Sequence, residues 1–126
     1  MWTDCDIKQT LLIGIQTILL KRGWAYDPFG GPKGETGTLQ ALYQAARSLS
    51  FPHSNSPLFL QRIDNATNQL ADLLDEIARE HLGTSDTQLW GGIIAFDQNK
   101  NKTINDAMEL LAVAAYRCEQ QGEKGQ

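Results

Sequence analysis

The chain has 126 residues, of which 41% are hydrophobic, and it carries a net charge of −4 with an isoelectric point of about 5.0. A single domain over residues 1–126 fits this length, and roughly two-thirds of the unfolded chain's surface would be buried on folding. The acidic balance excludes a large basic face that holds nucleic acid by releasing counterions, and the apolar content excludes an intrinsically disordered chain.

An amphipathic helix is predicted over residues 6–22. Its apolar side chains recur every three or four positions and form one stripe: Ile7, Leu11, Ile15 and Ile18, with Leu12 and Leu19 beside them. Ile13 and Leu20 fall on the opposite side, so we expect this helix to pack on more than one face. Gly23 is placed to end the helix in the left-handed conformation, with Trp24 folding back onto the last turn.

The most apolar run of the chain, residues 11–20, is too short to cross a bilayer. It also fails as a signal peptide, because Asp4 and Asp6 precede it and Lys21 and Arg22 follow where small residues are needed. The expected location is the cytoplasm, without membrane attachment.

The two cysteines, Cys5 and Cys118, lie near opposite ends of the chain. Small secreted domains use denser, even sets of cysteines, so a reducing compartment is the simpler interpretation. Whether the two ever form a disulfide between the chain ends is left open.

A loop rich in glycine and proline follows at residues 25–37. A phosphate loop would need Gly-Lys-Ser/Thr directly before a helix and after a strand, whereas here Lys33 precedes Gly34 and Glu35 would repel phosphate. We therefore interpret the segment as a connector. The next helix is predicted over residues 38–49, with an apolar stripe formed by Leu39, Leu42, Ala46 and Leu49.

The longest helix is predicted over residues 57–82. Pro57 has no amide to leave unsatisfied at its start, the Ser56 side chain can cap the first turn, and Gly83 stops it. Its core seam has the spacing of a heptad repeat: Phe59, Ile63, Ala66, Leu70, Leu73 and Ile77. Acidic side chains lie away from the seam and are interpreted as a solvated face: Asp72, Asp75 and Glu76.

A short apolar segment over residues 89–96 contains Trp90 and the pair Gly91-Gly92. Each glycine weakens a helix by roughly 1 kcal/mol relative to alanine, so this segment depends on packing. The last helix is predicted over residues 103–120, opened by an approximate capping box between Thr103 and Asp106. The polar tail, residues 121–126, is expected to fray. The seam of the last helix is formed by Ile104, Ala107, Leu111, Ala114 and Cys118.

The stretch before the last helix begins like a calcium-binding loop, with Asp97, Asn99 and Asn101 two residues apart. It departs from that pattern at two decisive positions, because Lys102 replaces the glycine of the sharp turn and Met108 replaces the bidentate glutamate. We therefore interpret it as a polar turn that positions the last helix, and we expect no metal.

No catalytic constellation is recognisable in the sequence. His53 and His81 lie far apart and have no cysteine or carboxylate at metal-ligand spacing, and His-Glu-x-x-His is absent. Cys118 lies on an apolar seam, away from the polarised setting that a nucleophilic cysteine requires. We expect a protein that is not an enzyme and that uses no cofactor.

Three short motifs follow one another along the chain. Residues 21–24 (Lys-Arg-Gly-Trp) close the first helix, residues 38–42 (Thr-Leu-Gln-Ala-Leu) open the second, and Leu89-Trp90 is followed by Phe96-Asp97 and a helix start at Lys102-Thr103. Over roughly residues 7–118, this order resembles a family of small bacterial helical proteins known only as a domain of unknown function. The resemblance implies an all-α fold and brings no established activity.

We therefore expect an all-α fold, a compact bundle of about four helices with one Gly/Pro-rich loop. The expected function is that of a non-catalytic protein-interaction or regulatory module with a protein partner, a homodimer being one form of it. The alternative is a protein that binds a small molecule or a divalent ion through the loops 26–38 and 97–103. The candidate contact residues are aromatic or polar residues of the N-terminus and the loops: Trp2, Tyr26, Phe29, Asp97, Asn99 and Asn101.

Overall fold

The computed structural model of the chain describes residues 2–24, 34–83, 89–99 and 102–124. Its helices in chain order are α1 (Asp4–Arg22), α2 (Thr38–Ser50), the short 3-10 helix η1 (Phe51–His53), α3 (Pro57–Leu82), α4 (Gly91–Asp97) and α5 (Ile104–Lys124). The all-α prediction is confirmed, although the described residues form five α-helices where the sequence predicts about four. Most of the predicted Gly/Pro-rich loop, residues 25–33, lies outside the described residues.

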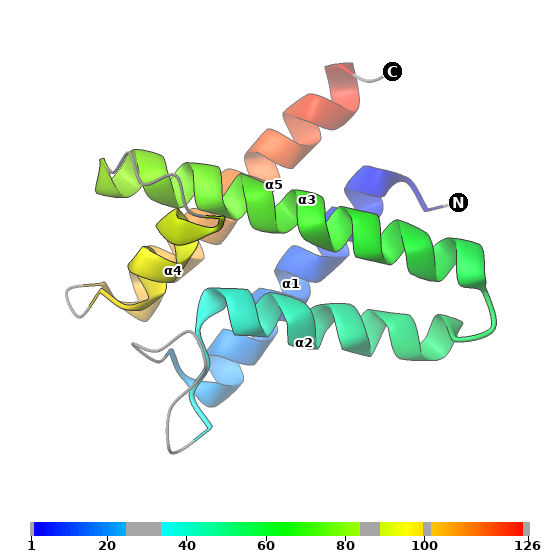
Figure 1. Cartoon of the computed structure of the whole chain (residues 1–126), viewed down its shortest axis with the longest axis horizontal. Coiled ribbons are helices and arrows are strands. Elements are labelled where there is room, and N and C mark those ends of the chain that lie inside the picture. Colours follow the sequence, from blue (N-terminus) through cyan, green and yellow to red (C-terminus); the bar gives the residue numbers. More distant parts are fainter. Residues whose placement is uncertain (1, 25–33, 84–88, 100–101, 125–126) are drawn as a thin grey trace.

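The helices form two crossed layers (Figure 1). In front, α2 and α3 make an antiparallel hairpin joined through η1, and behind them α1 and α5 run antiparallel to each other. The short α4 packs against α3 and α2, close to the C-terminal end of α3 and the start of α2. The two layers are joined by both rear helices, since α1 contacts α2 and α3, and α5 contacts α3.

Most residues of the predicted α3 and α5 seams are buried, whereas Phe59 and Ile104 are partly covered, and of the predicted α2 stripe only Leu42 is fully buried. Along α3 and α5 the buried seam residues are Ile63, Ala66, Leu70, Leu73, Ile77, Ala107, Leu111, Ala114 and Cys118. The stripe of α1 is buried too, except that Ile18 is only partly covered. Burying a large apolar side chain contributes about 1.5–3 kcal/mol before conformational entropy is counted, so these seams are the main source of stability.

The expectation that α1 packs on more than one face is wrong. Ile13 and Leu20 are 62% and 64% exposed. The residues that α1 buries, from Ile7 to Leu19, all belong to the stripe that meets its three neighbouring helices. Helical periodicity shows which residues share a face, but it does not show whether a second face finds a partner.

Two predicted helix ends are confirmed. Gly83 ends α3 in the left-handed conformation, with its N–H donating to the carbonyl oxygen of Arg79 at 2.8 Å. Thr103 and Asp106 form the predicted capping box before α5, since the Thr103 N–H donates to Asp106 at 2.7 Å. The helix then continues to Lys124, so the tail that was expected to fray from residue 121 is helical for most of its length.

Other helix ends differ from the prediction. Ser56 makes no side-chain capping bond, although Pro57 does occupy the first turn. Gly23 has a positive φ of 87° but an extended ψ of 161°, so the chain runs on beyond α1 and does not fold back. The Thr36 N–H donates to the Gly23 carbonyl oxygen at 3.1 Å, and Trp24 forms a single parallel bridge with Thr36.

The start of α4 is held by the acidic face of α3. Asp75 accepts a hydrogen bond from the Ile93 N–H at 3.0 Å and an ion-paired hydrogen bond from Arg79 at 2.8 Å. Trp90, whose φ is 57°, donates its indole N–H to Asp72 at 2.9 Å. The interpretation of this face as simply solvated is therefore wrong for Asp72 and Asp75, which dock α4 onto α3.

Gly92 is required by the close approach of α4 to α3. A Cβ atom at this position would lie 2.9 Å from the Asp75 carbonyl oxygen and would collide with the Cγ of Arg79. We expect Gly92→Ala to lower the free energy of unfolding by roughly 1–2 kcal/mol, because part of the contact is backbone that cannot give way. Helix propensity alone favours alanine by about 1 kcal/mol, so urea denaturation that showed a gain in stability would contradict this packing.

Candidate interaction site

Asp97, a candidate contact residue, is fully buried at the end of α4. Its carboxylate accepts a hydrogen bond from the Leu39 N–H at 3.2 Å and so caps α2, whose own N-cap, Gly37, has no side chain to do this. Burial raises the pKa of Asp97, against the lowering effects of Thr38, the Leu39 amide and the Trp24 indole. The expectation that Asp97 belongs to a partner-facing surface must therefore be corrected, because its carboxylate is enclosed.

The surroundings of Asp97 are polar but closed. Trp24 packs its ring against Phe96 at a centroid distance of 5.9 Å, which places the end of α1 beside α4. The Trp24 indole N–H, the Thr38 hydroxyl and the second carboxylate oxygen of Asp97 are buried here; the two donors are near enough to lower the pKa of Asp97, but neither meets hydrogen-bond geometry. The contacts between the end of α1, the start of α2 and α4 therefore fix the position of the start of α2.

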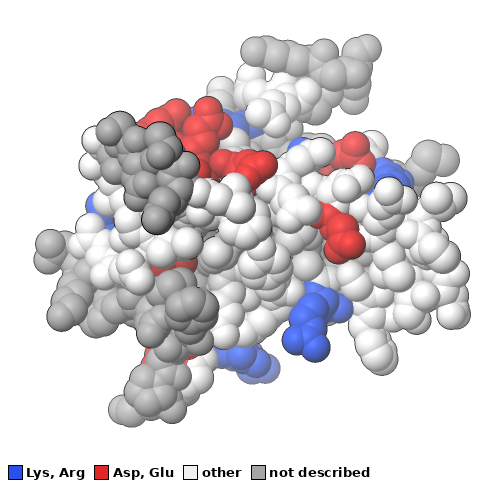
Figure 2. All heavy atoms as spheres, in the orientation of Figure 1, with Lys and Arg blue, Asp and Glu red and all other residues white. Residues whose placement is uncertain are grey.

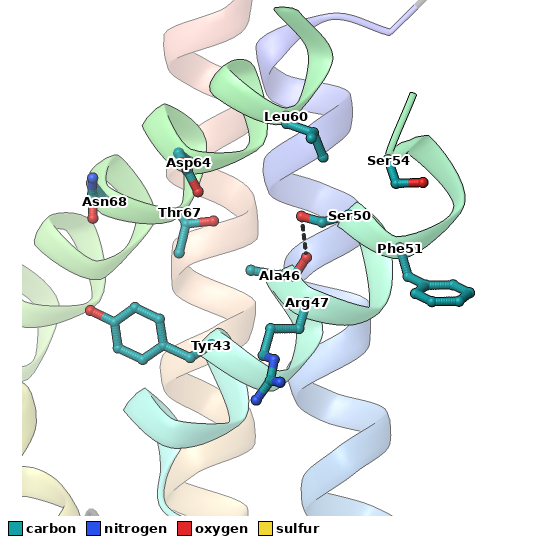
Figure 3. A pocket seen from close by; sticks show the side chains of 10 residues that line it. All are labelled: Tyr43, Ala46, Arg47, Ser50, Phe51, Ser54, Leu60, Asp64, Thr67 and Asn68. Carbon is teal, nitrogen blue, oxygen red and sulfur yellow. Dashed lines mark hydrogen bonds between the residues drawn. The ribbon is translucent and has the colours of Figure 1, made fainter. Parts of the chain in front are cut away.

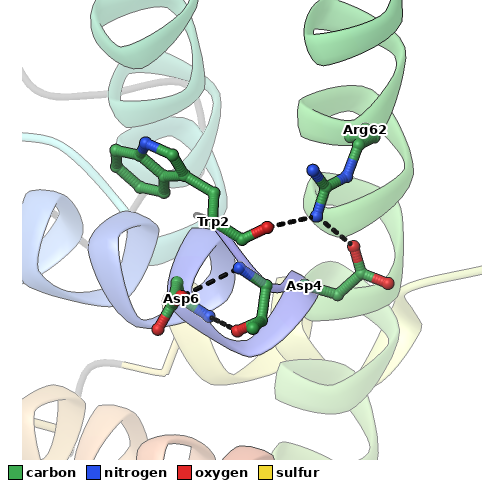
Figure 4. A network of polar contacts seen from close by, with 5 residues as sticks. Trp2, Asp4, Asp6 and Arg62 are labelled. Carbon is green, nitrogen blue, oxygen red and sulfur yellow. Dashed lines mark hydrogen bonds and ion pairs between the residues drawn. The ribbon is translucent and has the colours of Figure 1, made fainter.

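Trp2 is half-buried and packs within its own chain. Its ring lies 5.6 Å from that of Phe59 and 6.2 Å from that of His53, both edge-on. Its carbonyl oxygen accepts a hydrogen bond at 2.7 Å from Arg62, which also pairs with Asp4 (Figure 4). Trp2 therefore anchors the N-terminus to α3, so this candidate contact residue packs largely within its own chain.

Of the other candidate contact residues, the structure describes only Asn99. Asn99 is half-buried in a turn, where its N–H donates to the Phe96 carbonyl oxygen at 3.2 Å and its carbonyl oxygen accepts from Lys102 at 3.0 Å. Tyr26, Phe29 and Asn101 lie outside the described residues. The predicted site residues are thus not brought together into one surface.

A different surface is open on the outer face of α2. A groove of about 460 Å³ runs between α2 and α3 (Figure 3). Its lining is mixed, with apolar side chains and a few polar groups: Tyr43, Ala46, Arg47, Ser50, Phe51, Ser54, Leu60, Asp64, Thr67 and Asn68. In Figure 3, Tyr43 and Arg47 leave α2 opposite Asp64 and Asn68 of α3.

A second groove, of about 430 Å³, lies between α2 and the end of α4. Its lining residues are Leu39, Gln40, Tyr43, Gln44, Arg47, Ile94 and Gln98. Tyr43 and Arg47 line both grooves and stand one helical turn apart, so they form the ridge between them. We call this ridge, together with its two grooves, the Tyr43/Arg47 surface.

The lining of the Tyr43/Arg47 surface contains one arginine, Arg47 of α2, and one carboxylate, Asp64 of α3. Arg47 is exposed and has no carboxylate within ion-pair distance among the described residues, whereas Arg62, Arg79 and Arg117 are each paired with an acidic side chain. Arg22 donates to the neutral side chain of Gln44 at 3.0 Å, beside the second groove. Figure 2 shows basic side chains over the lower part of this face, where α1 and α2 lie, and a group of acidic side chains above them.

Tyr43 adds an aromatic to this surface. It is 41% exposed, and its ring packs against Trp90 at 6.2 Å, which holds it in place from one side. Partial burial raises the pKa of its phenol, so the hydroxyl stays protonated and can donate at neutral pH. Neither Tyr43 nor Arg47 was singled out from the sequence. Their spacing of four residues, off the apolar stripe of α2, shows only that they share one face of the helix.

No protein-family model, curated protein or solved structure matches this chain. Within residues 2–24, 34–83, 89–99 and 102–124, no three His, Cys, Asp or Glu side chains are grouped so that they could hold a metal ion. None of the helices described is both long enough and apolar enough to cross a membrane. Among the described residues, Tyr43 and Arg47 are exposed side chains that line two neighbouring grooves.

Proposed function

We propose that the protein is a non-catalytic interaction module that binds a partner protein through the Tyr43/Arg47 surface. The observation that supports this is the meeting of two grooves at an exposed tyrosine and an exposed arginine that has no ion pair among the described residues. Tyrosine and arginine are among the residues that most often dominate binding energy at interfaces, because they combine a large contact area with directed hydrogen bonds.

The chemistry of the surface indicates what the partner presents. Apolar side chains of the partner would fill the grooves beside Tyr43, and a carboxylate between them would pair with Arg47 and reach Arg22. A guanidinium binds a carboxylate through two parallel hydrogen bonds, which fixes orientation as well as adding energy. Because the chain as a whole is acidic, with a net charge of −4, the exposed guanidinium of Arg47 also steers an acidic segment to this face.

The alternative function, binding of an ion or a small molecule by the loops 26–38 and 97–103, has less support. In the calcium-loop pattern Asp97 is the first carboxylate ligand, but in the structure it is buried against the start of α2. Releasing it to an ion would remove the cap from Leu39. Calorimetric titration with Ca²⁺ tests this alternative directly, and saturable heat would favour it over the interaction module.

The proposal predicts that Arg47→Glu and Tyr43→Ala each weaken partner binding at least about tenfold, as loss of an interface hot spot does. The measurement is quantitative capture from a lysate of the source cell, with each immobilised variant compared with the native chain. Tyr116→Ala is the matched control, because Tyr116 is a 63% exposed tyrosine of α5 that lines neither groove.

Only the two groove variants should lose the captured protein, and both should keep native helical circular dichroism. Equal capture by all four proteins, or a loss confined to Tyr116→Ala, would exclude this surface as the contact site.

A further inference from the structure

The two cysteines of the chain lie side by side. The Sγ atoms of Cys5 and Cys118 are 3.3 Å apart, although 113 positions separate the residues in the sequence. Each thiol also faces the backbone carbonyl oxygen of the other residue, at 3.6 Å and 4.0 Å. Both are free thiols in the structure, so the first turn of α1 and the C-terminal part of α5 meet at a dithiol.

A second contact fixes the register of the two helices at this point. One turn further along α1, the Gln9 side-chain amide donates to the Ala115 carbonyl oxygen at 2.9 Å. The two thiols also differ in access, because Cys118 is buried, with 2% exposure, whereas Cys5 is half-buried. A reagent from solution therefore meets Cys5 first, with Cys118 held directly behind it.

We propose that Cys5 and Cys118 form a redox-modification site, at which a low-molecular-weight disulfide converts the dithiol into a disulfide that joins α1 to α5. A sulfur–sulfur bond is about 2.05 Å long, so closure requires the two sulfur atoms to approach by little more than 1 Å. Side-chain rotation and a small helix shift are enough for this, because both side chains already point at each other.

The reaction proceeds by two exchange steps. The Cys5 thiolate attacks one sulfur of the small disulfide, the sulfur–sulfur bond breaks, and one thiol leaves after taking up a proton. The Cys118 thiolate then attacks the Cys5 sulfur of this mixed disulfide and expels the second small thiol. Cys5 and Cys118 are oxidised, losing two electrons and two protons in total, and the small disulfide is reduced to two thiols.

The environment of Cys118 predicts how the rate of the second exchange step depends on pH. Burial, together with the neighbouring Cys5, raises the pKa of Cys118 to about 12, so this thiol is almost entirely protonated at neutral pH. Closure onto Cys118 should therefore accelerate as the pH rises, and the mixed disulfide at Cys5 is an intermediate that disappears when the reaction is followed to its end. In a reducing compartment the pair rests as two thiols and closes only under oxidation, which is the behaviour of a redox sensor.

The experiment treats the native chain, Cys5→Ser and Cys118→Ser with oxidised glutathione and follows each by intact-mass spectrometry. The native chain should lose two hydrogen atoms and carry no stable adduct. Cys118→Ser should accumulate one glutathione adduct at Cys5, because the second thiol is missing, and Cys5→Ser should react far more slowly. Cys118→Ala repeats the test without placing a hydroxyl in the apolar site.

A stability measurement completes the test. Oxidation of the native chain should raise its melting temperature by roughly 10 °C or more, because the disulfide closes a long loop in the unfolded chain, and a thiol reductant should reverse the increase. A stable glutathione adduct on the native chain, a disulfide-linked dimer, or oxidation without a rise in melting temperature would each overturn the proposal.

Discussion

Leu70→Asp is expected to unfold the protein. Leu70 is fully buried near the middle of α3, on the seam that faces the rest of the core. Truncating such a leucine to alanine alone costs about 2–5 kcal/mol, and an unpaired carboxylate in an apolar site adds a large desolvation cost. Domains of this size have about 5–15 kcal/mol of stability, so the variant should lose its helical circular dichroism and its cooperative melting.

Leu58→Asp is the matched control, because it makes the same substitution on the same helix. Leu58 is 78% exposed in the first turn of α3 and lines neither groove of the Tyr43/Arg47 surface. A carboxylate there is solvated and favourable to the helix dipole, so stability should change by no more than about 0.5 kcal/mol. A Leu70→Asp protein that melted like Leu58→Asp would show that the α3 seam is not the core.

Asp97→Ala is expected to have the second-largest effect, a loss of about 2–3 kcal/mol in the free energy of unfolding. The substitution leaves the Leu39 N–H without its acceptor in a buried place and removes a side chain from a packed site, and a buried donor left without a partner costs about 1–3 kcal/mol by itself. Asp97→Asn keeps an oxygen acceptor of the same shape without the charge, so it should lose less at neutral pH. Urea denaturation of the two variants and the native chain measures both differences.

The stability difference between the native chain and Asp97→Asn should also depend on pH, and this dependence is a sharper test of the buried carboxyl. The folded-state pKa of Asp97 is raised above its ordinary value of 3.8, so the folded protein holds this proton more tightly than the unfolded chain does. The resulting stabilisation is fully present below about pH 3.8 and is lost as the pH rises through the folded-state pKa. Relative to Asp97→Asn, the native chain should therefore lose stability across this window, by at most about 1.4 kcal/mol per pH unit.

Other carboxyl groups do not obscure this comparison. The pKa values of Asp6, Glu80 and Asp106 are lowered, chiefly by hydrogen bonds from Thr3, Arg117 and Thr103 respectively, so their contributions are lost as the pH falls. These contributions are shared by the native chain and the variant and cancel in the difference. A difference that stayed flat with pH, or that favoured the native chain as the pH rose, would contradict a desolvated carboxyl at position 97.

Features that depend on near neighbours in the chain were predictable. The seam from Ile63 to Ile77 follows from helical spacing, because a stripe that wide must be buried. The stop at Gly83 and the box between Thr103 and Asp106 follow from residues within one turn of each other. The all-α class follows in turn, since these signals cover most of the chain.

Features that depend on tertiary contacts were not predictable. The cap of α2 comes from Asp97, which lies 58 residues beyond the Leu39 amide that it serves, and the cap of α4 comes from Asp75. In each case the helix starts at a residue with no side-chain cap of its own, so the sequence shows that a cap is missing but not which distant carboxylate accepts the hydrogen bond. The same limit applies to Cys5 and Cys118, whose proximity follows only from the packing of α1 on α5.

The candidate site was missed for a related reason. The polar spacing that is visible in the sequence falls in a loop, where Asp97 and Asn99 begin a pattern typical of a calcium-binding site. Tyr43 and Arg47 lie on a regular helix, and what distinguishes them is the space beside them and the absence of a carboxylate near Arg47 among the described residues. Neither property can be read from a helical pattern, because both depend on what α3 and α4 place next to α2.

Site-specific photocrosslinking in the source cell tests the interaction module most directly. A benzophenone amino acid placed at position 68, in the lining of the first groove, should capture one defined protein, and adding Arg47→Glu should abolish that product. The same probe at position 116, on α5 and away from both grooves, should not capture it. If position 68 gave no defined product, or if its product persisted with Arg47→Glu, the Tyr43/Arg47 surface would not be the site of a protein partner.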